Sequence, residues 1–90
     1  MSKIIDISSH LDVSTSPELK NVLTEAISAS EDIVLDFAKT ELVTSAGLRV
    51  LMQVQKNVNA SGLSMVMRNI SAGVMDVFNM TGVSKIFSIE

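Results

Sequence analysis

Apolar residues in this chain follow two different spacings. Four short runs are rich in Ile, Val, Leu, Met or Phe, which is typical of β-strands in a buried sheet. These runs cover residues 3–8, 33–37, 63–67 and 85–89. Three longer stretches repeat apolar residues every three or four positions, which predicts amphipathic helices. These stretches cover residues 16–27, 47–58 and 69–81.

The ends of the predicted helices carry recognisable signals. Ser16 precedes Pro17, so we expect the Ser16 hydroxyl to cap the first helix and Pro17 to occupy its first turn. Gly62 follows the second apolar stripe and Gly82 follows the third. Because glycine readily adopts the conformation that ends a helix, we expect these two glycines to end the second and third helices.

The alternation of strands and helices predicts an α/β fold, with about four strands in a mostly parallel sheet and three helices. A chain of 90 residues is expected to form a single domain over residues 1–90. In a parallel sheet, the loops that leave the carboxyl ends of the strands meet at one edge, where ligands usually bind. We therefore expect function to lie in three loops, at residues 10–16, 38–47 and 68–71.

Composition removes several function classes. Seven Lys and Arg against ten Asp and Glu give a net charge of −3 without a basic cluster, which disfavours nucleic-acid binding. The chain has no cysteine and one histidine, His10, so we expect no metal site and no cofactor. It shows neither a signal peptide nor an apolar stretch of roughly 20 residues, so we expect a cytoplasmic protein without membrane insertion.

The most informative segment begins the second predicted helix. Thr44 and Ser45 are adjacent hydroxyl residues, and a small Ala and Gly47 follow them. On physical grounds alone, Thr44 or Ser45 caps the helix and Gly47 permits close packing, because Ser and Thr are preferred caps in all proteins. This interpretation assigns the segment no function.

Residues 44–48, Thr-Ser-Ala-Gly-Leu, resemble the Asp-Ser-Ser-Gly-Leu or Ser-Ser-Ala-Gly-Leu signature of STAS domains, the anti-sigma factor antagonists of bacteria. Other stretches are similar to the family in order and spacing. They are Leu11-Asp12, Pro17-Glu18-Leu19, Val34-Leu35-Asp36-Phe37 and Thr81-Gly82-Val83 with Phe87. The resemblance implies a STAS-like fold in which the N-terminal strand of the family is shortened or absent.

The resemblance also implies a protein-interaction switch. Members of the family bind an anti-sigma factor, a serine kinase of the histidine-kinase-like ATPase type, and so release a sigma factor. The kinase phosphorylates the signature serine, and a phosphatase removes the phosphate. By this resemblance Ser45 is the phosphoacceptor, and Thr44, which replaces the acid of the commoner signature, is the second candidate. Asp12 matches an acid that the family places beside this site.

We expect the partner surface to surround the phosphoacceptor. It would comprise Asp12, Asp36, Thr44, Ser45, Gly47 and Arg49. A phosphate on Ser45 would add a charge of about −1.5 to −2. We expect that charge to face Asp12 and Asp36 and to weaken a docked complex through repulsion. Arg49 is expected to be exposed and to pair either with an acidic partner residue or with the phosphate.

Other readings of the same residues stay open. One is a STAS module that is not phosphorylated and is bound permanently in a larger assembly, such as a lipid-transport or stress-sensing complex. An open sheet edge, left by a missing N-terminal strand, would also allow a homodimer. An enzyme using Asp36 and Ser45 is disfavoured because the sequence offers no positioned base, metal cluster or glycine-rich phosphate loop. We therefore predict no catalytic activity.

Overall fold

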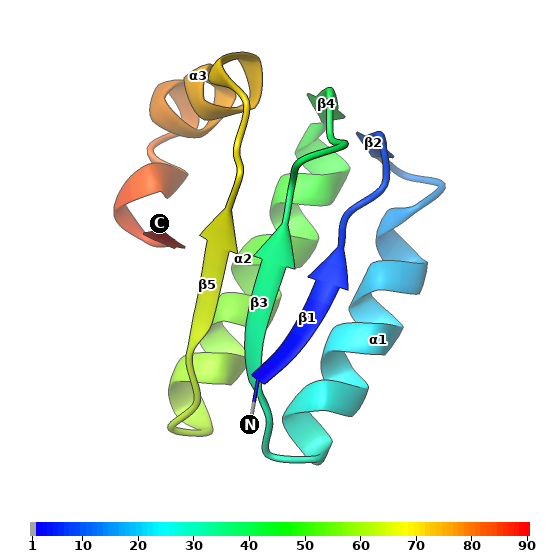
Figure 1. Cartoon of the computed structure of the whole chain (residues 1–90), viewed down its shortest axis with the longest axis vertical. Helices are drawn as coiled ribbons and strands as arrows, with labels where there is room; N and C mark the ends of the chain where they lie inside the picture. The colour runs from blue at the N-terminus through cyan, green and yellow to red at the C-terminus, as the bar shows by residue number, and fades with distance from the viewer. Residues whose placement is uncertain (1) are drawn as a thin grey trace.

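The computed structural model of the chain describes residues 2–90. Its elements lie in two layers, with helices behind a twisted sheet (Figure 1). In chain order they are β1 (Ser2–Asp6), β2 (His10–Leu11), α1 (Ser16–Ser28), β3 (Asp32–Asp36), β4 (Leu42–Val43), α2 (Ser45–Ala60), β5 (Met65–Arg68), α3 (Ala72–Thr81), the 3-10 helix η1 (Val83–Lys85) and β6 (Ser88–Ile89). The main sheet has the order β1-β3-β5-β6 and all of its pairs are parallel. The predicted α/β fold is thereby confirmed.

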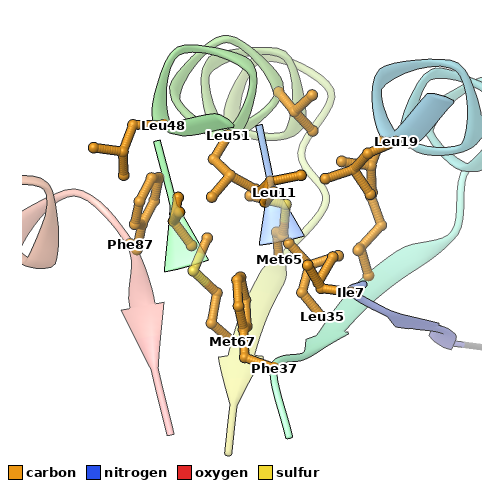
Figure 2. Close-up of a cluster of buried hydrophobic side chains, with 14 of the residues drawn as sticks. Ile7, Leu11, Leu19, Leu35, Phe37, Leu48, Leu51, Met65, Met67 and Phe87 are labelled. Atoms are coloured by element: carbon orange, nitrogen blue, oxygen red, sulfur yellow. The ribbon is translucent and has the colours of Figure 1, made fainter. Parts of the chain in front are cut away.

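The hydrophobic core lies between one face of this sheet and the helices. Leu35 of β3, and Met65 and Met67 of β5, point to this side and are almost fully buried (Figure 2). Ile33, two positions before Leu35 on the same strand, is also fully buried. Side chains at the intervening positions point to the opposite face, where Val34 is only partly buried. Figure 1 shows no helix in front of β1, β3 and β5 on that face. One face of the described sheet is therefore uncovered.

The C-terminal part of the chain packs through three phenylalanines. The ring of Phe78, on α3, lies 6.1 Å from that of Phe37 and 5.5 Å from that of Phe87, with edge-to-face geometry in both pairs. Such aromatic pairs stabilise a fold beyond the area they bury. They attach α3 and the segment leading to β6 to the end of the sheet.

The predicted strand over residues 85–89 is wrong for its first three residues. Val83–Lys85 form a 3-10 helix, and only Ser88 and Ile89 pair with β5. Val83 and Phe87 are both buried, while Ile86 is about half exposed. This spacing of four residues suits a helical turn, and the Phe87 N–H donates to the Val83 carbonyl over 3.0 Å.

The starts of two helices also differ from the prediction. Thr15, not Ser16, is the residue that precedes α1, and the buried Ser16 hydroxyl donates to the Asp12 carbonyl instead of capping the helix. The third helix begins at Ala72 because Asn69 has a φ of 59°, which is outside the helical region. Its cap is Ser71, whose Oγ accepts the Val74 N–H over 3.3 Å.

Candidate functional site

Two of the predicted functional loops are joined by a short parallel pairing that the sequence analysis missed. His10 pairs with Leu42 and Leu11 pairs with Val43, which forms the two-stranded sheet β2-β4. The Thr44 N–H then donates to the Leu11 carbonyl over 2.9 Å. This pairing brings the loop before α1 against the start of α2.

Gly47 permits this close approach. A Cβ atom at position 47 would lie 2.6 Å from the Leu11 carbonyl oxygen and 2.8 Å from the Leu11 Cγ. Both distances are well inside van der Waals contact, so a larger residue would push α2 away from β2. The predicted close packing at Gly47 is confirmed, and the structure identifies its partner as Leu11, which the sequence analysis did not connect with Gly47.

The two adjacent hydroxyls at the start of α2 have different environments. Thr44 is partly buried, and its hydroxyl lies 3.4 Å from the Leu11 carbonyl, to which it donates. Ser45 is exposed, and its hydroxyl has no hydrogen-bond partner within residues 2–90. Thr44 occupies the N-cap position of α2, in line with the prediction, but its hydroxyl makes no capping hydrogen bond. Ser45 is therefore the more accessible of the two hydroxyls.

The start of α2 also leaves backbone donors free. The first helical hydrogen bond runs from the Leu48 N–H to the Thr44 carbonyl over 3.0 Å. The N–H groups of Ser45, Ala46 and Gly47 precede this bond and have no acceptor in the part of the chain described. Such donors at a helix start favour a nearby negative charge.

Asp12 organises the loop that packs against this helix start. Its Oδ1 accepts the N–H groups of Ser14 and Thr15 over 2.9 and 3.2 Å. The Thr15 hydroxyl oxygen accepts the Asp12 N–H over 3.0 Å, which closes the turn. Because Asp12 directly follows Leu11, the structure brings it next to the start of α2, as the sequence analysis expected.

Arg49 separates two shallow grooves on the surface of α2. The first has a volume of about 400 Å³ and is lined by Ser45, Leu48, Arg49, Met52, Val83 and Ile86, among others. The second has a volume of about 340 Å³, and its walls include Val13, Lys20, Ala46, Arg49 and Val50. Arg49 is exposed, as predicted, and its guanidinium forms no ion pair or hydrogen bond with another residue between 2 and 90.

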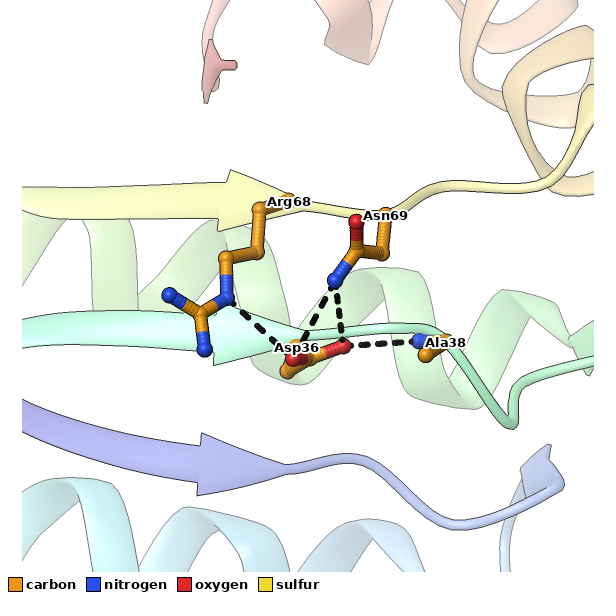
Figure 3. Close-up of polar contacts among 4 residues, drawn as sticks. All are labelled: Asp36, Ala38, Arg68 and Asn69. Atoms are coloured by element: carbon orange, nitrogen blue, oxygen red, sulfur yellow. Dashed lines mark hydrogen bonds and ion pairs between the residues drawn. The ribbon is translucent and has the colours of Figure 1, made fainter.

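Asp36 belongs to a different cluster, shown in Figure 3. Its carboxylate accepts the Ala38 N–H over 2.9 Å, the Asn69 amide over 3.2 Å and the Arg68 Nε over 3.2 Å. The Ala38 and Asn69 hydrogen bonds, together with Arg68, hold the pKa of Asp36 below its ordinary value.

The Asp36 side chain points to the uncovered face of the sheet, in line with Val34, whereas α2 packs on the core face. Within residues 2–90, the hydrogen bonds of the Asp36 carboxylate are all with residues that end or follow β3 and β5. The structure therefore hydrogen-bonds Leu11, the neighbour of Asp12, to the start of α2 but does not bring the Asp36 side chain to Ser45. A phosphate on Ser45 would not face Asp36, contrary to the sequence-based expectation.

Within residues 2–90, no group of three or more His, Cys, Asp or Glu side chains is arranged to hold a metal ion. No described helix combines the length and the apolar character needed to cross a membrane. The chemistry gathered at the start of α2 is that of an exposed hydroxyl, free backbone donors and a nearby unpaired cation.

The STAS domain family model matches residues 2–90, which is nearly the whole chain. The chain belongs to the STAS domain family. This assignment confirms the resemblance that the signature at residues 44–48 and the other matching stretches indicated.

Solved structures show the same fold. A Thermotoga maritima protein described as a candidate anti-sigma factor antagonist is 20% identical with a TM-score of 0.82, and the match covers 96% of this chain and 77% of that one. SpoIIAA, an anti-sigma factor antagonist, in its unphosphorylated form is 18% identical with a TM-score of 0.83, and the match covers 99% of this chain and 79% of that one. The phosphorylated form of the Bacillus SpoIIAA is 16% identical with a TM-score of 0.75, and the match covers 99% of this chain and 82% of that one.

A sulfate transporter family protein from Wolinella succinogenes is also similar, with 18% identity and a TM-score of 0.83 over 93% of this chain and 69% of that one. At these identities the likeness establishes a common fold. The same STAS architecture thus occurs both in anti-sigma factor antagonists and in a transporter family protein.

Proposed function

We propose that this STAS domain is a cytoplasmic anti-sigma factor antagonist that is switched by phosphorylation of Ser45. It binds an anti-sigma factor that is a serine kinase of the histidine-kinase-like ATPase type, and a sigma factor is thereby released. Phosphorylation of Ser45 dissociates the complex, and a phosphatase restores the binding form. The observation that carries this proposal is the exposed, unbonded Ser45 hydroxyl at the start of α2.

The environment of the two hydroxyls supports Ser45 over Thr44 as the phosphoacceptor. A kinase must reach the hydroxyl and orient it toward the transferred phosphoryl group, so an exposed side chain is required. Ser45 meets this condition, whereas Thr44 is partly buried and its hydroxyl is directed at the Leu11 carbonyl. Thr44 therefore remains the second candidate.

The start of α2 can accommodate a phosphate without unfolding. Free backbone N–H groups and the positive end of the helix dipole both favour an anion at this place. The phosphate would also add a charge of about −1.5 to −2 next to the loop that contains Asp12. A partner docked on this surface would then meet like charge and a desolvation cost, which supports dissociation as the consequence.

The proposed partner surface consists of Asp12, Thr44, Ser45, Gly47 and Arg49. The carboxylate of Asp12 and the approach at Gly47 fix the shape of this surface. Asp36 is proposed to contribute indirectly, because its bond to the Ala38 N–H fixes the beginning of the loop that leads to β4. We assign this surface a binding role and no catalytic one.

The similarity to the Wolinella succinogenes transporter family protein favours a second candidate function. In this alternative the chain is a STAS module that is not phosphorylated and remains bound in a larger assembly. The start of α2 would then be a permanent contact. The two candidates make opposite predictions for a negative charge at position 45.

Tandem mass spectrometry on the protein from its native host tests the proposal. We expect one phosphate on Ser45. Phosphate on Thr44 would move the phosphoacceptor by one residue, and its absence under all growth conditions, stress included, would favour the permanently bound module.

Capture of partners from the same host provides the functional test. Ser45→Ala should retain the anti-sigma factor, whereas Ser45→Asp should weaken its capture by roughly a hundredfold or more, since lost charge complementarity costs several kcal/mol. Ser45→Asn is the matched control, because it places a side chain of the same size as Asp at position 45 and adds no charge. Equal capture by Ser45→Asp and the unmodified protein would contradict the switch.

A further inference from the structure

We propose that Arg49 binds the phosphate on Ser45 within the same helix and is thereby withdrawn from the partner. This inference rests on the proposed function, in which Ser45 is the modified residue, and it deepens that proposal by naming a second residue of the switch. The unphosphorylated protein presents Arg49 as a free cation. The phosphorylated protein presents a phosphate paired with a guanidinium.

The spacing of Ser45 and Arg49 places both side chains on one face of α2. Ser45 and Arg49 are four positions apart on α2, so their side chains emerge from the same face of the helix, one turn apart. Both are exposed and both line the groove between α2 and η1. The guanidinium has a planar set of N–H donors that matches the oxygens of a phosphate, and its flexible side chain spans one helical turn.

No acidic side chain in α2 or in the walls of the two grooves competes with a phosphate for the Arg49 guanidinium. Helix α2 contains no Asp or Glu, and neither groove that Arg49 lines has an acidic residue in its walls. Asp12, the acid beside the start of α2, already accepts two backbone N–H groups. Arg49 has no ion-pair partner within residues 2–90. A phosphate on Ser45 would thus find this guanidinium unoccupied.

Arg49 lines both grooves on the surface of α2, so its pairing state affects both of them. Lys20 is the other cation of the groove formed with α1, and it too has no ion pair in the described part of the chain. An acidic segment of the anti-sigma factor would therefore find Arg49 at the shared wall of two partly apolar grooves. Pairing with the phosphate would remove this contact from both grooves at once. Phosphorylation would act by removing a cation from the surface as well as by adding an anion.

The pairing can be measured without a kinase or a partner. Phosphoserine is incorporated at position 45 during synthesis of the full chain, and the phosphate is titrated by phosphorus NMR. A nearby cation stabilises the dianion, so we expect its second pKa to lie below the value of about 6 for a free phosphoserine. Arg49→Ala should raise that pKa by about half a unit or more, and Arg49→Lys should restore part of the difference.

Lys56→Ala is the matched control, because it removes an exposed cation from the same helix at a distance of almost two turns from Arg49. We expect it to leave the titration unchanged. Identical titrations for Arg49→Ala and the phosphoprotein with Arg49 would overturn the proposal. They would mean that the phosphate interacts with the backbone N–H groups at the start of α2 and not with Arg49. That result would not contradict phosphorylation of Ser45 in the host, because here phosphoserine is incorporated during synthesis. A lack of phosphate on the protein from its native host would contradict the proposed switch and would not affect the measured pairing of Arg49 with phosphoserine.

Discussion

A single missing side chain sets the distance between α2 and β2. An added Cβ at Gly47 would overlap the Leu11 carbonyl, an atom of the backbone that cannot rotate away. The sequence predicted a tight contact here from the residue type and its place at a helix start. It could not identify the contact partner, because that depends on the pairing of Leu11 with Val43.

Gly47→Ala is expected to destabilise the protein by about 1–3 kcal/mol, since the backbone must shift to relieve the overlap. Gly73→Ala is the matched control. An added Cβ at Gly73 meets no atom within 4 Å, and alanine should stabilise α3 by up to about 1 kcal/mol. Urea unfolding of the two variants measures both effects. A stabilising effect at both positions would contradict the close approach that the structure shows.

The difference between Thr44 and Ser45 is a further lesson at this scale. The sequence predicted that one of these hydroxyls matters, and the signature ranked Ser45 first. The sequence could not distinguish their environments, because these depend on the contact between the Thr44 hydroxyl and the Leu11 carbonyl. The sequence placed the cap at these residues, and Thr44 is the N-cap residue, but its hydroxyl donates to Leu11 instead of capping the helix.

At the scale of elements, length decides what the sequence could predict. Helices α1 and α2 have 13 and 16 residues, and their apolar stripes are long enough to give a clear periodicity. Strands β2 and β4 have two residues each, so no alternation can appear in them. Residues 85–87 were predicted as strand for a similar reason, because the spacing of Val83 and Phe87 covers only one helical turn.

Two serines near helix starts lead to a prediction about capping. The Ser71 hydroxyl accepts the Val74 N–H, whereas the Ser45 hydroxyl makes no bond within residues 2–90. Ser71→Ala should therefore reduce the free energy of unfolding by about 0.5–2 kcal/mol. Ser45→Ala should change it by no more than about 0.5 kcal/mol, as expected for a surface position. Thermal unfolding of both variants provides the comparison, and equal losses would show that Ser45 also caps its helix.

At the scale of the whole molecule, Asp36 links segments that are far apart in the sequence. It joins the loop after β3 to Arg68 and Asn69, which lie 32 and 33 positions further along the chain (Figure 3). The sequence showed an acid at the end of a strand but not these partners. They follow from the parallel register, in which Asp36 lies opposite Arg68. This clamp connects the two central strands at the edge that carries the functional loops.

The lowered pKa of Asp36 makes this clamp dependent on pH. Because its pKa is lower in the folded than in the unfolded state, the folded protein favours the carboxylate. Its contribution to stability is present above the unfolded pKa and is lost as the pH falls through the folded pKa. Asp36→Asn should therefore be less stable than the unmodified protein near pH 6, and the gap should narrow toward about pH 2, below the ordinary carboxyl pKa.

Asp76→Asn is the control for this titration, because it removes the same charge from an exposed carboxylate that has no ion pair or hydrogen bond among the described residues. Urea unfolding at several pH values measures the free energy of unfolding of all three proteins. If the difference in free energy of unfolding between Asp36→Asn and the unmodified protein stays constant with pH, the charge of Asp36 does not contribute to stability. The substitution would then act only through contacts that do not depend on that charge. A gap that closes for Asp36→Asn alone would attribute the acid sensitivity to the link between β3 and β5, and hence to the edge of the sheet where the loops meet.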